Sequence, residues 1–200
     1  MLTNGSRSSC KAGSRLLDQG AISERVYALV NGRVRISYTE PGGHEVLMAI
    51  RGPGDLLGEY AQQDHGAHMA TVWTLEHCET VVFTPGSFDA AIRRLGLEEA
   101  LQQYILHKYR QIPKRLWQAS NLQTEQRMAL LLMEILNADP VRNDAAVPMT
   151  QQQISDALGV ARSSVTRLLA NWRDAGFIRI GRGLLEVLDR AALARRASRT

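Results

Sequence analysis

Cysteine is scarce in this chain, and long apolar runs are absent. Its 200 residues include two cysteines, Cys10 and Cys78. Two are too few for a disulfide framework or for the four thiolates of an iron–sulfur cluster, so we expect both thiols to be free. No stretch approaches the roughly 18 apolar residues of a membrane-spanning helix, and residues 1–19 contain no apolar segment typical of a signal peptide. These absences predict a cytoplasmic protein with no membrane partner.

Lysine is missing from the last quarter of the chain, where the positive charge is nevertheless concentrated. Residues 150–200 contain nine arginines and four acidic residues, a net charge of +5. The whole chain carries +4, so residues 1–149 carry −1. Localised arginine is typical of proteins that contact the phosphate backbone of DNA, because neutralised phosphates release condensed counterions. A solubilising basic tail would explain only the arginines at 195, 196 and 199.

Between Leu16 and Thr84, short β-rich runs alternate with turn residues, which is typical of an antiparallel barrel or sandwich. We predict strands at 26–30, 34–38, 46–50, 69–75 and 80–84. Asn31-Gly32 separates the first two runs, and both residue types tolerate the positive φ of a type I′ turn. The pattern therefore predicts that these two strands pair as a hairpin.

Helical periodicity replaces the β pattern after Gly86. We expect Ser87 to cap a short helix, and longer helices from about Leu97 to Ser120 and from about Thr124 to Asn137. Pro113 lies inside the longest helix, where it removes a hydrogen bond and should kink or break the helix. This helix has no second helix of its own domain to pack on, so we predict that it binds a second copy of the chain.

Residues 151–168 have the spacing of a helix-turn-helix. The two short helices of this motif need apolar or small residues on their inner faces and a glycine at the turn. All of them are present: Ile154, Ser155, Leu158, Gly159, Val160, Val165 and Leu168. Residues 177–180 and 184–188 then have the pattern of a two-stranded wing. An ordinary helix pair followed by a β-hairpin is the alternative, but it would not need the basic charge.

The exposed half of the second helix supplies the predicted DNA contacts, because the N-terminal part of that helix enters the major groove. We expect base contacts from Arg162, Ser163, Thr166 and Arg167. Arginine can bond both acceptors of a guanine edge. We expect phosphate contacts from Thr150, Ser164, Arg173 and Arg182. The alternative for each arginine is a solvated helix face.

These segments together resemble the Crp/Fnr family of transcription regulators. The resemblance covers about residues 16–188 and is strongest at 16–32, at Pro53-Gly54-Asp55-Leu56-Leu57-Gly58-Glu59 and in the helix-turn-helix. It implies an α+β fold with an antiparallel β-roll or jelly-roll sensor domain at 1–95, a long dimerisation helix at 96–121 and a winged helix-turn-helix domain at 122–200. It also implies a homodimer that binds palindromic operators in double-stranded DNA, with RNA polymerase as a further partner. Ser163 departs from the family pattern, which usually has glutamate after the first arginine.

The resemblance also implies an effector pocket lined by Gly58, Glu59, Met69, Ala70 and Ile112. In cyclic-nucleotide binders, an arginine about ten residues after the Gly-Glu pair neutralises the cyclic phosphate. Here Met69 and Ala70 stand in that place. Burial of a phosphate without a cation is costly, so we expect that cyclic AMP is not the effector and leave the cofactor unassigned.

Histidine and cysteine side chains leave alternatives open. We predict no metal site, but His65, His68, His77 and Cys78 are the candidates for a metal or haem, because imidazole and thiolate are metal ligands. A regulator controlled by another small ligand is a further alternative. So are a regulatory subunit that acts on a protein partner and a β-barrel enzyme that uses Glu59, His65 and His68. The spacing reveals no set of nucleophile, base and orienting group, so we predict a regulator and not an enzyme.

Overall fold

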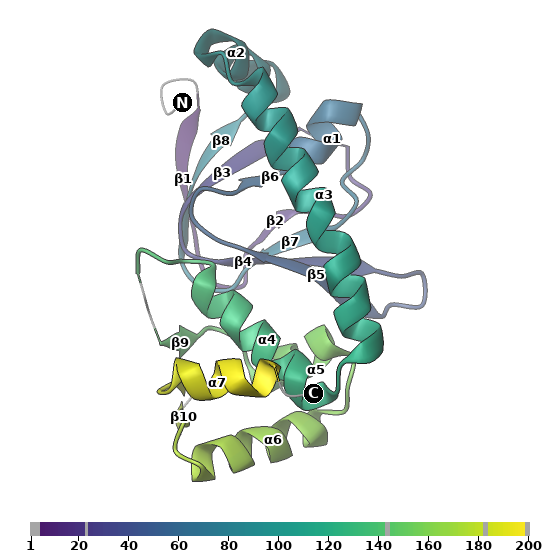
Figure 1. The fold of residues 1–200 in the computed structure, drawn as a ribbon. Coiled ribbons are helices and arrows are strands. Elements are labelled where there is room, and N and C mark those ends of the chain that lie inside the picture. The colour runs from purple at the N-terminus through teal and green to yellow at the C-terminus, as the bar shows by residue number, and fades with distance from the viewer. Residues whose placement is uncertain (1–4, 23, 143–144, 182–183, 199–200) are drawn as a thin grey trace. The chain divides into compact units, whose positions relative to one another are not determined.

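The computed structural model describes residues 5–22, 24–142, 145–181 and 184–198. The chain folds into two compact units, Met1–Val34 with Gly52–Asn121, and Arg35–Arg51 with Leu122–Thr200. Antiparallel sheets, a long helix and a helix-turn-helix are present, which confirms the predicted α+β fold (Figure 1). The division into domains at 1–95, 96–121 and 122–200 stays a prediction. None of the described helices is long and apolar enough to cross a membrane.

The first unit contains an antiparallel sheet with the strand order β1-β8-β3-β6. Its strands are β1 (Ser6–Cys10), β3 (Val26–Asn31), β6 (Leu56–Leu57) and β8 (Cys78–Phe83). β8 pairs with β1 from Ser6↔Val82 to Cys10↔Cys78 and with β3 on its other side. β2 (Arg15–Leu17) and β7 (Thr71–Thr74) form a further antiparallel pair. The sequence pattern revealed neither β1 nor β2, because β1 is mostly polar and β2 is only three residues long.

The predicted hairpin at Asn31-Gly32 is wrong. β3 pairs with β8 and β6, whereas β4 (Val34–Thr39) belongs to another sheet, beside β5 (Glu45–Arg51). A type I′ turn needs a positive φ at both central residues. Gly32 has a φ of 82°, but Asn31 keeps the conformation of strand β3. The chain therefore leaves one sheet at this glycine and enters another.

The helices of the first unit are α1 (Glu59–Asp64), α2 (Pro85–Leu95) and α3 (Glu98–Asn121). The predicted cap of α2 is wrong: Thr84 caps the helix, and its Oγ1 accepts a hydrogen bond from the backbone N–H of Ser87. The sequence predicted a kink or a break at Pro113; α3 does not break there, because the helix continues through Pro113, and the kink stays a prediction. Proline removes one hydrogen bond from a helix of 24 residues, and contacts of the preceding turns with the rest of the unit hold the chain in place.

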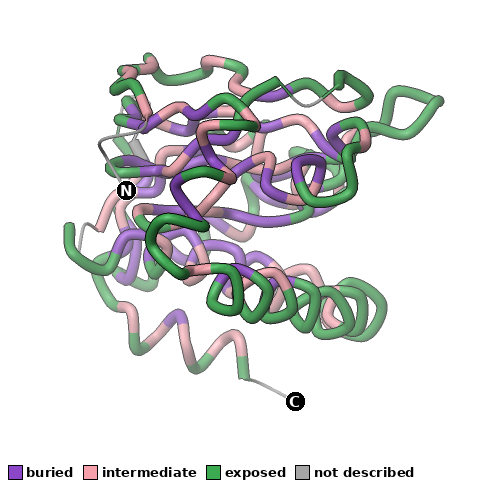
Figure 2. The backbone as a smooth tube through the Cα atoms, turned by 90° about the horizontal axis from the view of Figure 1, so that it is seen from above, coloured by how far each residue is buried: buried purple, intermediate pink, exposed green. Residues whose placement is uncertain are grey.

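Helices α2 and α3 close the core of the first sheet. Phe83 of β8 packs edge to face against Phe88 of α2, with ring centroids 5.9 Å apart. The buried cluster around them consists of Val26, Val81, Phe83, Phe88, Ala91, Ile92 and Leu101. Buried residues gather along the strands and on the inner sides of helices (Figure 2). This core fixes the N-terminal turns of α3.

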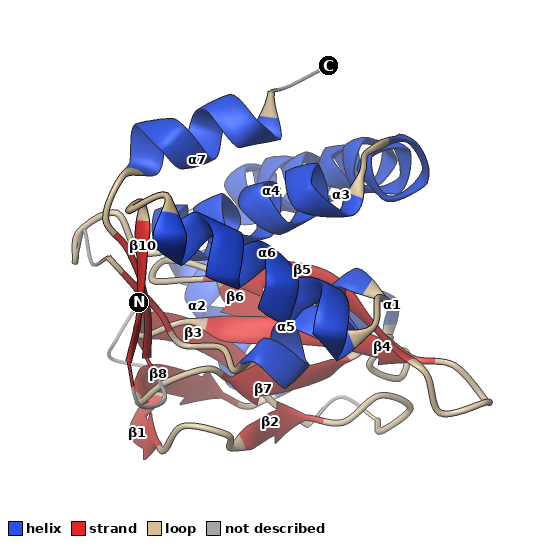
Figure 3. Ribbon diagram, turned by 90° about the horizontal axis from the view of Figure 1, so that it is seen from below, coloured by secondary structure: helices blue, strands red, loops and turns tan. Residues whose placement is uncertain are grey.

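The second unit combines β4 (except Val34) and β5 with the C-terminal segment. Ile50 of β5 donates its backbone N–H to Glu134 Oε1 of α4 at 3.1 Å. The C-terminal elements are α4 (Thr124–Asn137), β9 (Ala146–Val147), α5 (Gln151–Leu158), α6 (Arg162–Asp174), β10 (Ile178–Gly181), β11 (Leu184–Val187) and α7 (Arg190–Ala197). α4 packs on α7 and α5 on α6 (Figure 3), and the strands form an antiparallel sheet in the order β10-β11-β9. The wing strands are present as expected, and β9 adds a third.

Candidate DNA-binding surface and effector pocket

Two local signals set the length of α5. Thr150 Oγ1 accepts a hydrogen bond from Gln153 N at 3.1 Å, and Gln153 Oε1 accepts one from Thr150 N at 2.8 Å. This reciprocal capping box satisfies backbone donors at the N-terminus of the helix. Gly159 ends the helix with a φ of 63°, in the left-handed region that glycine adopts without strain. The turn to α6 follows directly.

The inner faces of α5 and α6 are apolar, as the motif requires. Ile154, Ser155 and Leu158 of α5 are buried, and so are Val165, Leu169 and Trp172 of α6. Leu168 was predicted to seal the two helices, but it is only half-buried, as is Val160. Leu169 takes that place because residues four and seven positions after Val165 follow the helical period.

Trp172 fastens α6 to the rest of the second unit. Its side chain is fully buried, and its indole Nε1–H donates to Glu125 Oε1 at 2.9 Å. Arg196 of α7 forms an ion pair with the same carboxylate oxygen. These contacts join α6 to α4 and α7 and so hold the outward face of α6 in a fixed orientation within the unit.

The four residues expected to contact bases lie exposed on the N-terminal half of α6: Arg162, Ser163, Thr166 and Arg167. Thr166 Oγ1 lies 2.9 Å from Gln151 Oε1 and 3.0 Å from the Arg162 carbonyl oxygen. Within the described part of the chain, neither Arg162 nor Arg167 has an ion-pair partner. Both guanidinium groups are therefore available to an outside acceptor.

The residues expected to contact phosphate differ in their surroundings. Thr150 is exposed, although its hydroxyl takes part in the cap of α5, and Ser164 is half-buried. Arg173 is exposed and lies 2.9 Å from Asp174, an ion pair that solvent weakens. Arg182 lies outside the described residues. On the described wing strands, Arg179 of β10 lies opposite Glu186 of β11, with Arg179 Nε 2.8 Å from Glu186 Oε2.

The predicted effector pocket contains a buried ion pair that the sequence did not reveal. Glu59 begins α1, and its Oε1 accepts a hydrogen bond from Lys108 Nζ of α3 at 2.5 Å. The side chains of Glu59 and Lys108 are 2% and 4% exposed. Lys108 Nζ also donates to the Leu56 carbonyl oxygen at 2.9 Å. Lysine at a helical position is normally solvated, so nothing in the sequence marked this one as internal.

One turn earlier on α3, Tyr104 makes a second contact with the same segment. Its hydroxyl donates to Asp55 Oδ1 at 2.8 Å and accepts the Leu56 N–H at 2.9 Å. Burial raises the pKa of Tyr104 well above its usual range, and the carboxylates of Asp55 and Glu59 raise it further. Lys108 Nζ lies 4.7 Å from the Tyr104 ring centroid. Two adjacent turns of α3 are therefore bonded to the segment that leads into α1.

The remaining residues of the predicted pocket divide into two groups. Ala70 is buried and Gly58 is half-buried beside Glu59. Met69 and Ile112, in contrast, are 53% and 48% exposed. The α3 residue that meets Glu59 is therefore Lys108 and not Ile112, which lies one turn further along the helix.

Comparison with known proteins agrees with this arrangement. A family model for the cyclic nucleotide-binding domain matches residues 7–94, and one for the Crp-like helix-turn-helix domain matches residues 126–196. The chain is 28% identical to the cyclic AMP receptor protein of Thermus thermophilus over 185 residues, which cover 90% of this chain and 83% of that protein. The chain belongs to the Crp/Fnr family of transcription regulators. The resemblance noted in the sequence is thereby confirmed, together with a helix-turn-helix DNA-binding domain.

Further Crp/Fnr relatives cover nearly the whole chain. The CRP-like cAMP-activated global transcriptional regulator of Mycobacterium tuberculosis is 25% identical over 190 residues, 92% of this chain and 85% of that protein. Among solved structures, FixK2 from Bradyrhizobium japonicum has a TM-score of 0.80 at 18% identity and covers 98% of both chains. A CRP/FNR family regulator from Thermus thermophilus has a TM-score of 0.76 at 21% identity, covering 97% of this chain and 99% of that one. At such identity the two structures support the fold alone.

The metal candidates of this Crp/Fnr chain are not gathered at one place. His65 and His77 are exposed, whereas His68 and Cys78 are buried. Burial lowers the pKa of His68, and the carboxylate of Asp18 partly opposes that shift. Among the residues that the structure describes, no three histidine, cysteine or carboxylate side chains form a group that could hold a metal ion.

Helix α3 of the Crp/Fnr chain leaves a stripe of large apolar side chains exposed. We call this stripe the α3 apolar stripe; it consists of Leu106, Tyr109, Ile112, Leu116 and Trp117, each between 46% and 67% exposed. Tyr109 also contacts the Tyr60 ring, at 5.2 Å between centroids. Contiguous apolar surface of this kind usually marks an interaction site.

Proposed function

We propose that this Crp/Fnr regulator binds pseudo-palindromic operators in double-stranded DNA as a homodimer, and that cyclic AMP is not its effector. The observation that carries the proposal is the outward face of α6. There Arg162 and Arg167 lie exposed near two hydroxyl side chains, on a helix whose inner face is fully packed. Guanidinium groups suit guanine edges, and hydroxyls suit bases or phosphates.

The α3 apolar stripe supports the dimer. A second copy related by a twofold axis would cover the same stripe with itself, which removes apolar surface of both copies from water. Twofold symmetry of the protein then requires twofold symmetry in the operator. For two helix-turn-helix motifs, the half-sites would lie about one helical turn of DNA, roughly 34 Å, apart.

The contacts of Glu59 argue against cyclic AMP. Relatives of this chain are named for that nucleotide, but here Lys108 already occupies the Glu59 carboxylate, and Met69 and Ala70 offer no cation to a phosphate. A nucleotide would have to break a buried ion pair and to bury its phosphate charge without a guanidinium partner. Both steps are costly.

RNA polymerase is the further partner that we propose for the DNA-bound dimer, because regulators of this family act on transcription. The cytoplasm, where bacterial operators lie, is the compartment that fits this role. The enzyme alternative loses support, because Glu59 is engaged by Lys108 and His65 is exposed.

The proposal is tested by selection of bound genomic fragments with the purified full-length chain, with and without cyclic AMP or cyclic GMP. We expect one twofold-symmetric motif that is the same in all three conditions, and light scattering at about twice the chain mass. Calorimetry should detect no nucleotide binding below millimolar concentration. A monomer that selects an asymmetric motif would overturn the dimer. Sub-micromolar cyclic AMP binding would overturn only the proposal that cyclic AMP is not the effector, and would leave the dimer and the operator untouched.

A further inference from the structure

The pairing of β1 with β8 places the two cysteines of the chain directly opposite each other. Cys10 is the last residue of β1, Cys78 is the first of β8, and the register is Cys10↔Cys78. Directly opposite residues of an antiparallel pair point to the same face of the sheet, with Cβ atoms about 4.5–5.5 Å apart. A disulfide needs Cβ atoms roughly 3.5–4.5 Å apart. A small approach of the two strand ends would therefore allow the bond.

Neighbouring contacts hold these strand ends together. On the face that carries the cysteines, Cys10 Sγ lies 4.0 Å from Ser8 Oγ. Ser9, which alternates to the opposite face, has its Oγ 2.8 Å from His77 Nε2, just before β8. The register at Cys10 is thus supported by a side-chain bond next to it as well as by the ladder.

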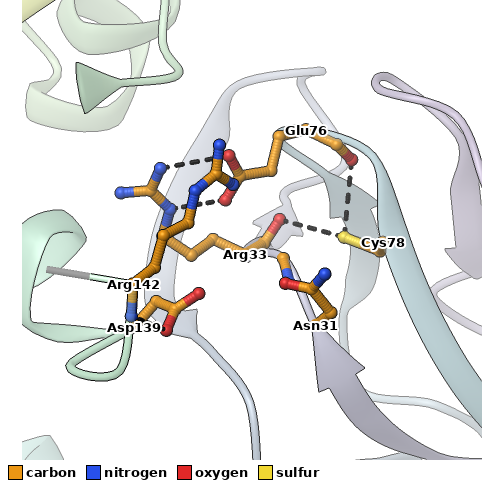
Figure 4. A network of polar contacts seen from close by, with 7 residues as sticks. Asn31, Arg33, Glu76, Cys78, Asp139 and Arg142 are labelled. Carbon is orange, nitrogen blue, oxygen red and sulfur yellow. Dashed lines mark hydrogen bonds and ion pairs between the residues drawn. The ribbon is translucent and has the colours of Figure 1, made fainter. Parts of the chain in front are cut away.

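The two thiols differ in their access to solvent. Cys10 is half-buried, whereas Cys78 is fully buried. Figure 4 shows the Cys78 thiol facing two backbone carbonyl oxygens, Arg33 at 3.5 Å and Glu76 at 3.4 Å. Burial, together with the charges of the Glu76 carboxylate and Cys10, raises the pKa of Cys78 to about 12. Cys10 is therefore the thiol that an external reagent can reach.

Glycine at position 32 is what allows the Cys78 thiol to lie where it does. A Cβ on Gly32 would come within 2.7 Å of Cys78 Sγ. The thiol is thus enclosed by the Gly32-Arg33 backbone on one side, and strand β1 is its neighbour in the sheet. The Arg33 carbonyl oxygen also accepts the Leu75 N–H at 2.9 Å, so it keeps a partner when the thiol turns away.

We propose that Cys10 and Cys78 form a reversible disulfide within one chain when the protein meets a low-molecular-weight disulfide such as glutathione disulfide. The Cys10 thiolate attacks one sulfur of the oxidant, forms a mixed disulfide and releases one glutathione thiolate. Cys78 Sγ then attacks Cys10 Sγ, its proton goes to the second glutathione, and the Cys10–Cys78 bond forms. Two protein thiols are oxidised, and one disulfide is reduced to two thiols.

Reversibility follows from the geometry. The bond joins neighbours in a sheet whose ordinary Cβ separation exceeds that of a relaxed disulfide, and such strain makes a disulfide easier to reduce. Cys78 also gives up its contacts with the Arg33 and Glu76 carbonyl oxygens. The sequence-based expectation that both thiols stay free therefore holds only under reducing conditions.

The test uses the full-length chain in glutathione buffers of graded redox ratio, followed by acid quenching, alkylation and intact-mass measurement. We expect a monomeric species about 2 Da lighter than the reduced chain, with no alkylated thiol, and reversal by dithiothreitol. The effective concentration of the thiol pair should be at least about tenfold higher in the folded chain than in concentrated urea.

Two variants assign the order of the steps. Cys78→Ser should stop at glutathione on Cys10, and Cys10→Ser should take up no glutathione while folded. The reference condition is a glutathione redox ratio at which the chain in urea has formed the Cys10–Cys78 disulfide. The proposal is overturned if, at that ratio, the folded wild-type chain gives only glutathione-capped Cys10 or only disulfides between two chains. Rapid uptake by Cys10→Ser would overturn the assigned order. The wild-type measurement does not depend on either variant folding, and none of these outcomes depends on DNA binding.

Discussion

The outward face of α6 and the pocket around Glu59 place polar groups in opposite ways. On α6, Arg162 and Arg167 point away from a packed apolar face and have no described ion-pair partner. Around Glu59, the charged groups point inward and bond to one another, with Lys108 held by both Glu59 and the Leu56 carbonyl oxygen. The guanidinium groups of Arg162 and Arg167 are available to a ligand, whereas the charged groups around Glu59 already have partners within the chain.

This difference separates stability from binding. A buried charge that loses its partner is strongly destabilising, whereas an exposed arginine contributes little to the free energy of unfolding. Substitutions around Glu59 should therefore act mainly on folding. Substitutions on α6 should act mainly on DNA. The four predictions below test that separation, in order of decreasing effect.

The largest effect is expected from Lys108→Met, which leaves the Glu59 carboxylate buried without its cation. We expect a loss of about 3–5 kcal/mol in the free energy of unfolding, measured by urea denaturation at neutral pH. Glu59→Gln combined with Lys108→Met should recover at least about 1 kcal/mol of the summed losses of the single variants. Strict additivity of the two single losses would show that the pair is not coupled.

Arg162→Ala should weaken DNA binding and leave the stability of the fold nearly unchanged. We expect a loss of about 1–3 kcal/mol in binding to the selected operator, with relaxed base preference at the contacted position. The free energy of unfolding should change by less than about 0.5 kcal/mol. Arg7→Ala removes the same charge from an exposed position on β1 and serves as the control. An unchanged selected motif for Arg162→Ala would place base recognition elsewhere.

Tyr104→Phe isolates one hydroxyl of the pocket. The variant removes the acceptor of the Leu56 N–H and the donor to Asp55, so we expect a loss of about 1 kcal/mol in unfolding free energy. Tyr109→Phe on the same helix is the matched control, because that tyrosine is 46% exposed. Equal losses for the two variants would mean that the buried hydroxyl has no special role.

His68 should produce the smallest effect, a dependence of stability on pH. Its pKa is lowered in the folded state, so the unfolded chain binds the proton more readily, and stability falls as the pH drops below about 6.5 towards the folded pKa. The contribution of His68 to the slope of the free energy of unfolding against pH should stay below roughly 1.4 kcal/mol per pH unit, the value for the uptake of one full proton. Urea denaturation from pH 7.5 to about 5 should show that the free energy of unfolding of His68→Asn depends less steeply on pH than that of the wild type. His65→Asn should have the wild-type slope. It is a suitable control because His65 is exposed and asparagine tolerates the left-handed backbone conformation of that position. A slope that His68→Asn leaves unchanged would contradict the assignment.

The helix-turn-helix shows how far local pattern reaches. Ile154, Leu158 and Val165 are buried as predicted, because their positions follow from the helical period and from Gly159. Leu168 and Ser87 show the limit of this reasoning. Leu168 was chosen by the helical period, which Leu169 also fits, and Ser87 was chosen as a helix cap, a role that Thr84 also fits. Errors of this kind concern which of two nearby residues packs inward or caps the helix, and the helix itself is still predicted correctly.

The pocket and the sheet show where local pattern stops. Nothing near Lys108 in the sequence indicates Glu59, because the two are 49 residues apart and meet only when α3 packs beside α1. The hairpin at Asn31-Gly32 failed for the same reason, since the pairing of β3 with β8 depends on a strand far along the chain. The entropy cost of bringing distant strands together is offset only when the contacts of the whole unit form. A short stretch of sequence therefore does not reveal which distant strands pair.

By itself, the sequence determined the kind of fold, the two helices that meet at Gly159 and the basic surface of the C-terminal segment, because apolar spacing, turn residues and charge all act over a few residues. Only the tertiary structure decided that Lys108 neutralises Glu59 inside the protein and that Cys10 stands opposite Cys78. The physical reason is that a buried charge or a reactive thiol is defined by what surrounds it, and those surroundings come from segments that are distant in the chain.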